Sequence, residues 1–484
     1  MSTPLSSALP EVPMRWSVKD VASVAQGQLL NPSLADGIAI NAVITDSRTV
    51  ATGQLFVALR GEIHDAHNFL AESQQGGAAA LLICRPESLP DGLLNKIPVI
   101  VVDDTDESLL LLAAAWRRRF DLPVIAITGS NGKTTCKEMI GQILRLYFGK
   151  VLTTPGNLNN AVGLPLTLLG LDGERRAAIV ELGMNHPGEI ARLAMVAMPD
   201  VALVTNAQRA HLERMGSVAA VAREKGLLYD ALQGQDGVAI INLDDPHADM
   251  WLQQNRTAGR RIAGFSLHDQ SADYYAVAST RNGNTHLDIQ TINGRAQLLL
   301  LPPGSHNAAN ALAAIASAQS IGVPLEVCIE ALASFVGVPG RLQTRRMKNG
   351  ALLLEDTYNA NPESFRAAID VLSATAGQKV VVMGDMAETG DAAAQYHDEI
   401  GGYAKSQGVD RLLALGDLAR LAAHNFGEGG QSFDSPEDIV AALSREVSSE
   451  STVLVKGSRF MRMERVVDAL AAVAAAPGNV TESN

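Results

Sequence analysis

The segment PVIAITGSNGKTT at residues 123–135 constrains the fold of this chain more than any other feature. Its first half is an apolar run typical of a buried strand, and apolar residues at helical spacing follow its end. Between them lies a glycine loop that ends in Lys133 and Thr134. Glycines let backbone N–H groups approach anionic oxygens, and a helix N-terminus adds positive partial charge. Strand, glycine loop and helix in this order predict a nucleotide-phosphate site in an α/β domain.

The loop departs from the usual phosphate-loop pattern at one position, because Ile127 stands where a glycine is common. Taken alone, a Gly–Lys–Thr triplet would also suit an ordinary turn. The strand before it and the helix after it favour the nucleotide site. We therefore expect ATP or GTP as ligand, with Lys133 near the terminal phosphates and the Thr134 hydroxyl on Mg²⁺.

Composition narrows the class of protein. A length of 484 residues suits about three domains, and a net charge of −13 argues against a nucleic-acid partner. Three scattered cysteines give neither a disulfide framework nor metal-ligand spacing, which fits a reducing cytoplasm. The chain has no apolar run of membrane-spanning length and no secretory signal pattern. We predict a cytoplasmic protein without membrane insertion.

The pattern of strands and helices divides the chain into three regions and predicts an α/β fold class. Residues 14–106 mix short strands and helices, as in a small α/β domain. Residues 107–336 alternate apolar strands with helices, as in a doubly wound parallel sheet, and include antiparallel hairpins over 272–301. Residues 337–484 form a second alternating, Rossmann-like unit without a phosphate loop of its own. Ligands are expected where parallel strands end.

Polar residues follow several of these predicted strands. Glu181 ends an apolar strand in the same sheet as the phosphate loop, where it suits a Mg²⁺ ligand or, equally, a surface carboxylate. His211 lies beyond another strand end, and Lys225 lies on a following helix where an exposed lysine is the plainer interpretation. Arg341, near the boundary between the second and third regions, is either part of a linker or, if the third domain closes on the second, a residue that faces the phosphates.

Taken together, the motifs resemble those of the Mur ligase family, ATP-dependent amide-forming enzymes of peptidoglycan synthesis. The likeness covers the chain after residue 14. It rests on TGSNGKTT (128–135), TPGNLNNAVGLP (154–165), ELGMNHPGEI (181–190), TNAQRAHLERMGS (205–217), NLDD (242–245), GSHNAANALAA (304–314), PGR (339–341) and EDTYNANPES (355–364).

Two segments resemble one member in particular, the ligase that adds D-alanyl-D-alanine to UDP-N-acetylmuramoyl-tripeptide. They are TYNANPES and the N-terminal stretch over 45–69. The resemblance implies three domains, for the UDP substrate, for ATP and for the dipeptide, and a monomer. It also implies an acyl-phosphate intermediate. Another muramyl ligase, a folyl-polyglutamate synthase and a nucleotide switch that hydrolyses ATP without an acceptor remain as alternatives.

The resemblance also implies roles for individual residues, with ATP and Mg²⁺ as cofactors. The expected catalytic residues are Lys133, His211, Lys225 and Arg341. The expected ATP-binding residues are Gly129, Ser130, Asn131, Gly132, Lys133, Thr134, Thr135, Asn310, Arg341 and Asp356. The expected metal ligands are Thr134, Glu181, His211 and, if carbamylated, Lys225. The expected substrate residues are Asp46, Ser47 and Arg48 for the UDP group, Asn159 and Asn160 for the sugar–peptide, and Tyr358, Asn359 and Asn361 for the dipeptide.

One position departs from the family pattern, and four further residues have two possible roles. Leu227 stands where relatives often carry a glutamate, so no second carboxylate is expected there. Four further residues of the last region either line a closing cleft or are structural: Glu388, His397, Lys456 and Ser458.

Overall fold

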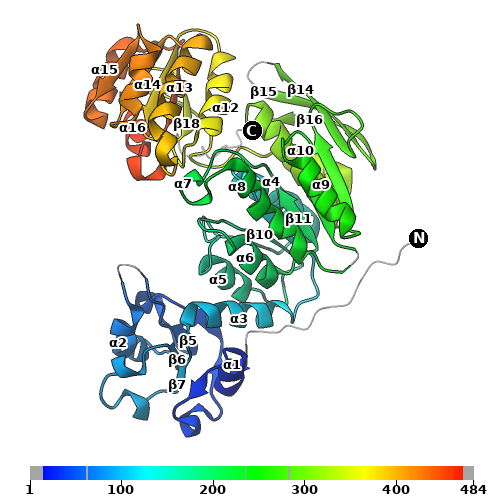
Figure 1. The fold of residues 1–484 in the computed structure, drawn as a ribbon, viewed down its shortest axis with the longest axis vertical. Helices are drawn as coiled ribbons and strands as arrows, with labels where there is room; N and C mark the ends of the chain where they lie inside the picture. The colour runs from blue at the N-terminus through cyan, green and yellow to red at the C-terminus, as the bar shows by residue number, and fades with distance from the viewer. Residues whose placement is uncertain (1–14, 62–63, 235, 282–283, 472–484) are drawn as a thin grey trace, which may run out of the picture.

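The computed structural model describes residues 15–61, 64–234, 236–281 and 284–471. Residue 14 and residues 472–484, which belong to the predicted domains, lie outside this part. Three main sheets follow one another along the long axis of the molecule, with the N-terminal region at one end and the C-terminal region at the other (Figure 1). The α/β class expected from the sequence is confirmed. Among the described residues, no helix has both the length and the apolar character to span a membrane.

The N-terminal region contains a five-stranded sheet in the order β2-β7-β6-β5-β4. Strands β4 to β7 run parallel, and β2 is antiparallel to β7. A small antiparallel pair, β1 with β3, lies apart from this sheet. The elements are β1 (Trp16–Ser17), α1 (Val18–Val24), β2 (Gln28–Leu29), β3 (Ala39–Ile40), β4 (Ala42–Ile44), β5 (Gln54–Val57), α2 (Leu70–Gln75), β6 (Ala80–Ile83) and β7 (Val99–Val101).

The central region contains a nine-stranded sheet in the order β16-β15-β14-β13-β12-β11-β8-β10-β9. Strands β8 to β14 run parallel, and β15 and β16 add the antiparallel hairpins expected over 272–301. The strands are β8 (Val124–Thr128), β9 (Val151–Thr153), β10 (Ala177–Glu181), β11 (Val201–Val204), β12 (Val238–Asn242), β13 (Arg261–Ser266), β14 (Tyr274–Arg281), β15 (Asn284–Thr291) and β16 (Gly294–Leu300).

Alternate residues of the central strands face two different helix layers. On β8, Ile125 and Ile127 pack in one core cluster, and Val124 and Ala126 pack in the other. Full burial of each valine or isoleucine side chain contributes roughly 1.5–3 kcal/mol. The first layer is α4 (Lys133–Phe148), α10 (Ser305–Gln319) and α11 (Leu325–Ala333). The second is α3 (Thr105–Arg117), α5 (Gly163–Leu169), α6 (Glu189–Ala197), α8 (Val218–Gly226) and α9 (Ala248–Thr257).

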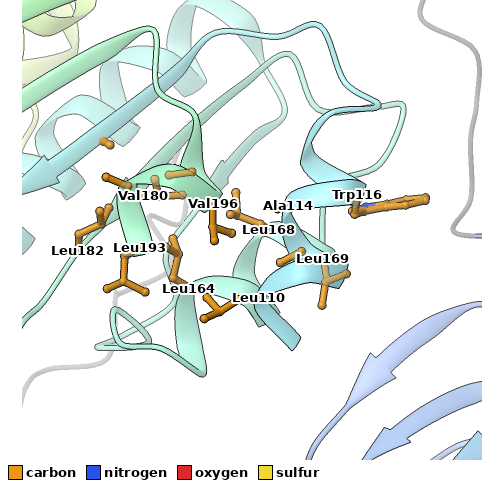
Figure 2. Packing of buried hydrophobic residues seen from close by; sticks show 14 of the residues in the cluster. Leu110, Ala114, Trp116, Leu164, Leu168, Leu169, Val180, Leu182, Leu193 and Val196 are labelled. Carbon is orange, nitrogen blue, oxygen red and sulfur yellow. The ribbon is translucent and has the colours of Figure 1, made fainter. Parts of the chain in front are cut away.

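Helix α3 joins the first two regions. Its N-cap Asp104 accepts hydrogen bonds from the backbone N–H groups of Asp106 and Glu107, at 2.7 and 3.0 Å. Leucine and alanine side chains of α3 pack against α5 and α6 (Figure 2). At its other end Trp116 meets Trp16 edge to face, with ring centroids 5.4 Å apart. One core cluster therefore crosses the expected boundary at 106/107, and that boundary remains a proposal.

The C-terminal region contains a six-stranded sheet in the order β17-β18-β22-β19-β20-β21, parallel except for β17. Its strands are β17 (Gln343–Arg346), β18 (Leu352–Asp356), β19 (Lys379–Gly384), β20 (Arg411–Leu415), β21 (Gly430–Phe433) and β22 (Thr452–Lys456). Helices α12 (Pro362–Ser373), α13 (Ala393–Ser406) and α14 (Ala419–Phe426) cover one face, and α15 (Pro436–Glu446) and α16 (Glu464–Leu470) cover the other. This agrees with the alternating, Rossmann-like unit expected for the region.

Candidate functional site

The glycine loop connects β8 to α4 and has the backbone conformation that its sequence predicts. Gly129 and Gly132 have φ of +152° and +84°, which side chains rarely adopt. A Cβ at Gly129 would come within 1.8 Å of the Thr205 hydroxyl oxygen. Helix α4 begins at Lys133, whose Nζ donates to the Gly129 carbonyl at 2.7 Å. Burial lowers the pKa of Lys133, although the Glu181 carboxylate acts in the opposite direction.

Glu181 ends β10 beside this loop and is buried. One carboxylate oxygen accepts a hydrogen bond from the Thr134 hydroxyl at 3.0 Å, and the other accepts one from the Asn159 amide at 2.8 Å. The expected metal residues Thr134 and Glu181 are thus adjacent, with a predicted substrate residue on the far side of the carboxylate. Only the fold brings them together, because they come from a helix, a strand and a loop.

The C-terminal region supplies the opposite wall of the site. Arg341 Nη2 donates to the Thr134 hydroxyl at 2.8 Å, and its guanidinium lies 4.1 Å from the ring centroid of Tyr358. Asp356 accepts a hydrogen bond from the backbone N–H of Leu342 at 3.2 Å and pairs with Lys456 Nζ at 2.6 Å. Asp356 therefore holds the residue next to Arg341, and Arg341 faces the phosphate loop as domain closure predicts.

Asn361 joins the same two regions. Its side chain caps α12 by accepting the Ser364 N–H at 2.9 Å, and it also donates to Asn131 Oδ1 at 2.9 Å. The Asn131 amide donates back to Asn361 at 3.2 Å. A direct role of Asn361 in dipeptide binding remains a prediction, because its polar atoms here serve the cap and the phosphate loop.

His211 and Lys225 differ in their surroundings. His211 has a positive φ of 57°, and its Nδ1 lies 2.7 Å from a carboxylate oxygen of Glu388 in the C-terminal region. That hydrogen bond is the main cause that lowers the pKa of Glu388. Lys225 is buried on α8, so its pKa lies well below the ordinary value, and the charge of Lys133 lowers it further.

A cavity of about 1110 Å³ between the central and C-terminal regions unites most of the expected residues. The expected residues along its wall are Ser130, Asn131, Gly132, Lys133, Thr134, Thr135, Asn159, Asn160, Glu181, His211, Asn310, Arg341, Asp356, Tyr358, Asn359 and Asn361. Five expected residues do not line it: Gly129, Lys225, Asp46, Ser47 and Arg48. The last three lie after β4, where Asp46 pairs with Arg48 at 2.6 Å. That ion pair lowers the pKa of Asp46 to about 2.

The donor set fits a Mg²⁺ ion that arrives with a nucleotide. In the described part of the chain, His, Cys, Asp and Glu residues form no cluster of three or more that would hold a metal by themselves. Mg²⁺ normally takes one or two protein oxygens together with phosphate oxygens and water. The Thr134 hydroxyl and the Glu181 carboxylate, 3.0 Å apart, match that requirement.

Two residues at or beside the site were not found from the sequence. Lys137 lies one helical turn after Lys133 and binds the carbonyls of Thr154 and Gly156 rather than lining the cavity. Arg209 pairs with Glu363 and, at 3.0 Å, with Glu399 in the C-terminal region. No local pattern marks Arg209, because its partners lie on helices far away in the chain.

Two protein-family models match the central and C-terminal regions of this chain. The family model "Mur ligase middle domain" matches residues 127–318, and "Mur ligase, glutamate ligase domain" matches residues 340–459. An Escherichia coli protein named UDP-N-acetylmuramoyl-tripeptide--D-alanyl-D-alanine ligase is 41% identical, and the match covers 90% of this chain and 94% of that protein.

Two solved structures extend the comparison to the fold. MurF from Acinetobacter baumannii is 34% identical with a TM-score of 0.87, covering 94% of this chain and 99% of that one. MurF ligase from Thermotoga maritima, in complex with ADP, is 28% identical with a TM-score of 0.77. That match covers 88% of this chain and 96% of the Thermotoga chain. With both family models matched and relatives similar over nearly their whole length, the chain belongs to the Mur ligase family.

Proposed function

We propose that this enzyme joins D-alanyl-D-alanine to UDP-N-acetylmuramoyl-tripeptide, with ATP as the energy source and ADP and phosphate as products. It is an ATP-dependent ligase of peptidoglycan precursor synthesis. The observation that carries the proposal is the contact of Arg341 with Thr134, which places a C-terminal guanidinium on the phosphate loop. Relatives that match over nearly their whole length carry this activity in their names. A different muramyl ligase and a folyl-polyglutamate synthase are therefore not favoured.

The first chemical step transfers the γ-phosphoryl group of ATP to the terminal carboxylate of the tripeptide. Both partners are anions, so the site must supply positive charge where they meet. Lys133 and Arg341 supply it from opposite sides of the cavity. Mg²⁺, held by Thr134 and Glu181, would neutralise phosphate charge.

The second step is attack by the amine of the dipeptide on the acyl phosphate, through a tetrahedral intermediate that releases phosphate. Tyr358 and Asn359 line the cavity from the C-terminal region and would bind the dipeptide. Asn159 and Asn160 line it from the central region, where the tripeptide carboxylate would lie. Docking of the two regions also limits water, which would hydrolyse an acyl phosphate.

The three regions receive separate tasks in this proposal. Residues 14–106 bind the UDP group, with Asp46, Ser47 and Arg48 near it. Residues 107–336 bind ATP, with Asn310 at the adenine. Residues 337–484 bind the dipeptide. One chain supplies all of these groups, consistent with action as a monomer.

Lys225 would be carbamylated and, with His211, would hold a second Mg²⁺. Carbon dioxide reacts with the neutral form of an amine, and burial of Lys225 favours that form. The test compares Lys225→Ala activity with and without a short-chain carboxylic acid such as acetate. Partial recovery supports the carbamate, and a fully active enzyme that shows no carbamate signal in ¹³C NMR after equilibration with ¹³C-bicarbonate would exclude it.

The deciding experiment measures phosphate release from ATP and Mg²⁺ with UDP-N-acetylmuramoyl-tripeptide, in the presence and absence of D-alanyl-D-alanine. We expect release only with both substrates and one amide formed per phosphate. D-alanine alone is the control acceptor. Release without the dipeptide would identify an ATPase, and activity with a single amino acid would identify a different ligase.

A further inference from the structure

We propose that Lys137 is a positioning residue that couples the ATP loop to the loop that holds the acyl substrate. The side chain is fully buried on α4, one turn beyond Lys133. It does not line the cavity, so it acts through the groups that it holds. The acyl-substrate loop is defined here as residues 154–160. Only the identity of the acyl substrate rests on the proposed function.

The Lys137 ammonium is bound mainly to this loop. Its Nζ donates to the carbonyl of Thr154 at 2.8 Å and to that of Gly156 at 3.3 Å. It also lies 3.1 Å from a carboxylate oxygen of Glu138 and 4.0 Å from one of Glu181. Burying an ammonium is costly unless its three donors find acceptors. The loop carbonyls must therefore stay in place for the lysine to remain satisfied.

The same loop holds the candidate metal ligand from two sides. Thr154 Oγ1 accepts a hydrogen bond from the backbone N–H of Glu181 at 2.9 Å. Asn159 donates to the Glu181 carboxylate at 2.8 Å, and its carbonyl accepts the N–H of Gly183 at 2.8 Å. Lys137 binds the carbonyls of Thr154 and Gly156, and Asn159 follows them in the same loop. Its removal would free the loop segment that sets the direction of Asn159.

The position of Lys137 on α4 allows the lysine to couple the phosphate loop to the acyl-substrate loop. Lys133 at the start of the helix lines the cavity, and Lys137 on the next turn holds the acyl-substrate loop. A shift of the helix N-terminus on nucleotide binding would pass directly to residues 154–160. A purely structural lysine would stabilise the fold without transmitting such a change.

The first experiment is hydrogen–deuterium exchange of residues 154–160 with and without the nonhydrolysable analogue AMP-PNP and Mg²⁺. In the wild type we expect the analogue to slow exchange of this segment about tenfold. In Lys137→Met we expect faster basal exchange and no response to the analogue, with AMP-PNP affinity within about twofold of the wild type. The control variant is Lys150→Met, which removes an exposed lysine just beyond the same helix. An equal response in wild type and Lys137→Met overturns the proposal.

Kinetics provide the second readout. For Lys137→Met we expect KM for UDP-N-acetylmuramoyl-tripeptide to rise about tenfold or more and kcat to fall, while KM for ATP changes little. Lys137→Gln retains donors for the two carbonyls and is expected to recover part of the loss. If Lys137→Met does not fold, Lys137→Gln replaces it in both experiments. Equal increases in both KM values would overturn the coupling role. Inactivity of the wild type with the dipeptide would instead refute the proposed function and leave the exchange result valid.

Discussion

Arg209 is the centre of an ion-pair network between the central and C-terminal regions. Its guanidinium makes two bonds to the Glu399 carboxylate, at 3.0 and 3.2 Å, and a further one to Glu363. The guanidinium also lies 4.8 Å from the ring centroid of Tyr396. Arg366 pairs with Glu399 from within the C-terminal region. Removing the charge of Arg209 should therefore loosen the docking of the two regions without disturbing either core.

The size of this effect follows from the burial of the network. The side chains of Arg209, Glu363 and Glu399 are 21%, 24% and 28% exposed, between surface and core values. An exposed ion pair contributes roughly 0.2–1 kcal/mol, and a hydrogen bond to a buried charged group about 1.5–3 kcal/mol. For the whole Arg209 cluster we take about 2 kcal/mol, which corresponds to a change of roughly 30-fold in the docking equilibrium.

The perturbation is Arg209→Met, which keeps most of the aliphatic stem. With an ATP analogue bound to both proteins, small-angle scattering should give Arg209→Met a larger radius of gyration than the wild type. The kcat/KM of Arg209→Met should be lower by up to about 30-fold. The matched control is Arg420→Met, which removes an exposed arginine paired with Asp434 within the C-terminal region. If Arg209→Met equals the control in both measurements, the network does not hold the regions together.

The same network predicts a pH dependence. The bonds from Arg209, followed by those from Arg366, lower the pKa of Glu399 below its ordinary value of 4.5. A lowered pKa means that docking favours the ionised carboxylate. The contribution is complete above the ordinary pKa and is lost as pH falls through the lowered one. Scattering between pH 7 and pH 3 should show the wild type opening in the acid range, with a smaller response in Arg209→Met.

Three further changes test the site and the core. Lys133→Ala should lower kcat by at least about 100-fold in the phosphate-release assay, because positive charge at the phosphates is lost, and near-normal turnover would contradict its role. Gly129→Ala should abolish ADP binding in calorimetry, because the new Cβ would lie 1.8 Å from the Thr205 hydroxyl oxygen. Adding Thr205→Ala in the same chain should restore part of the ADP binding. Phe365→Ala, which empties a fully buried position on α12, should lower the free energy of unfolding by about 3–5 kcal/mol in urea titration, and a loss below about 1 kcal/mol would show that the core collapses around it.

Short stretches of sequence were enough to predict the local elements and their polar ends. The apolar run before Gly129 indicated a buried strand, and the glycines after it suit the positive φ angles that the loop has. Glu181 was placed correctly at a strand end, because strand length and the edge of a parallel sheet are properties of a short stretch. Short strands such as β9 and β21, with three and four residues, are too short for a periodic pattern to mark them.

Which of these groups meet depends on the packing of whole domains. Arg341 reaches Thr134, Arg209 reaches Glu399, and Lys137 reaches the carbonyl of Thr154, and no local pattern pairs these residues with one another. Periodicity describes the environment of a residue within a turn or a strand. Contacts between regions depend on how whole sheets and helices pack, which a short window of sequence does not contain. The motifs therefore predicted the chemistry of the chain. The assembly of these residues into one site depended on docking of the C-terminal region against the central region.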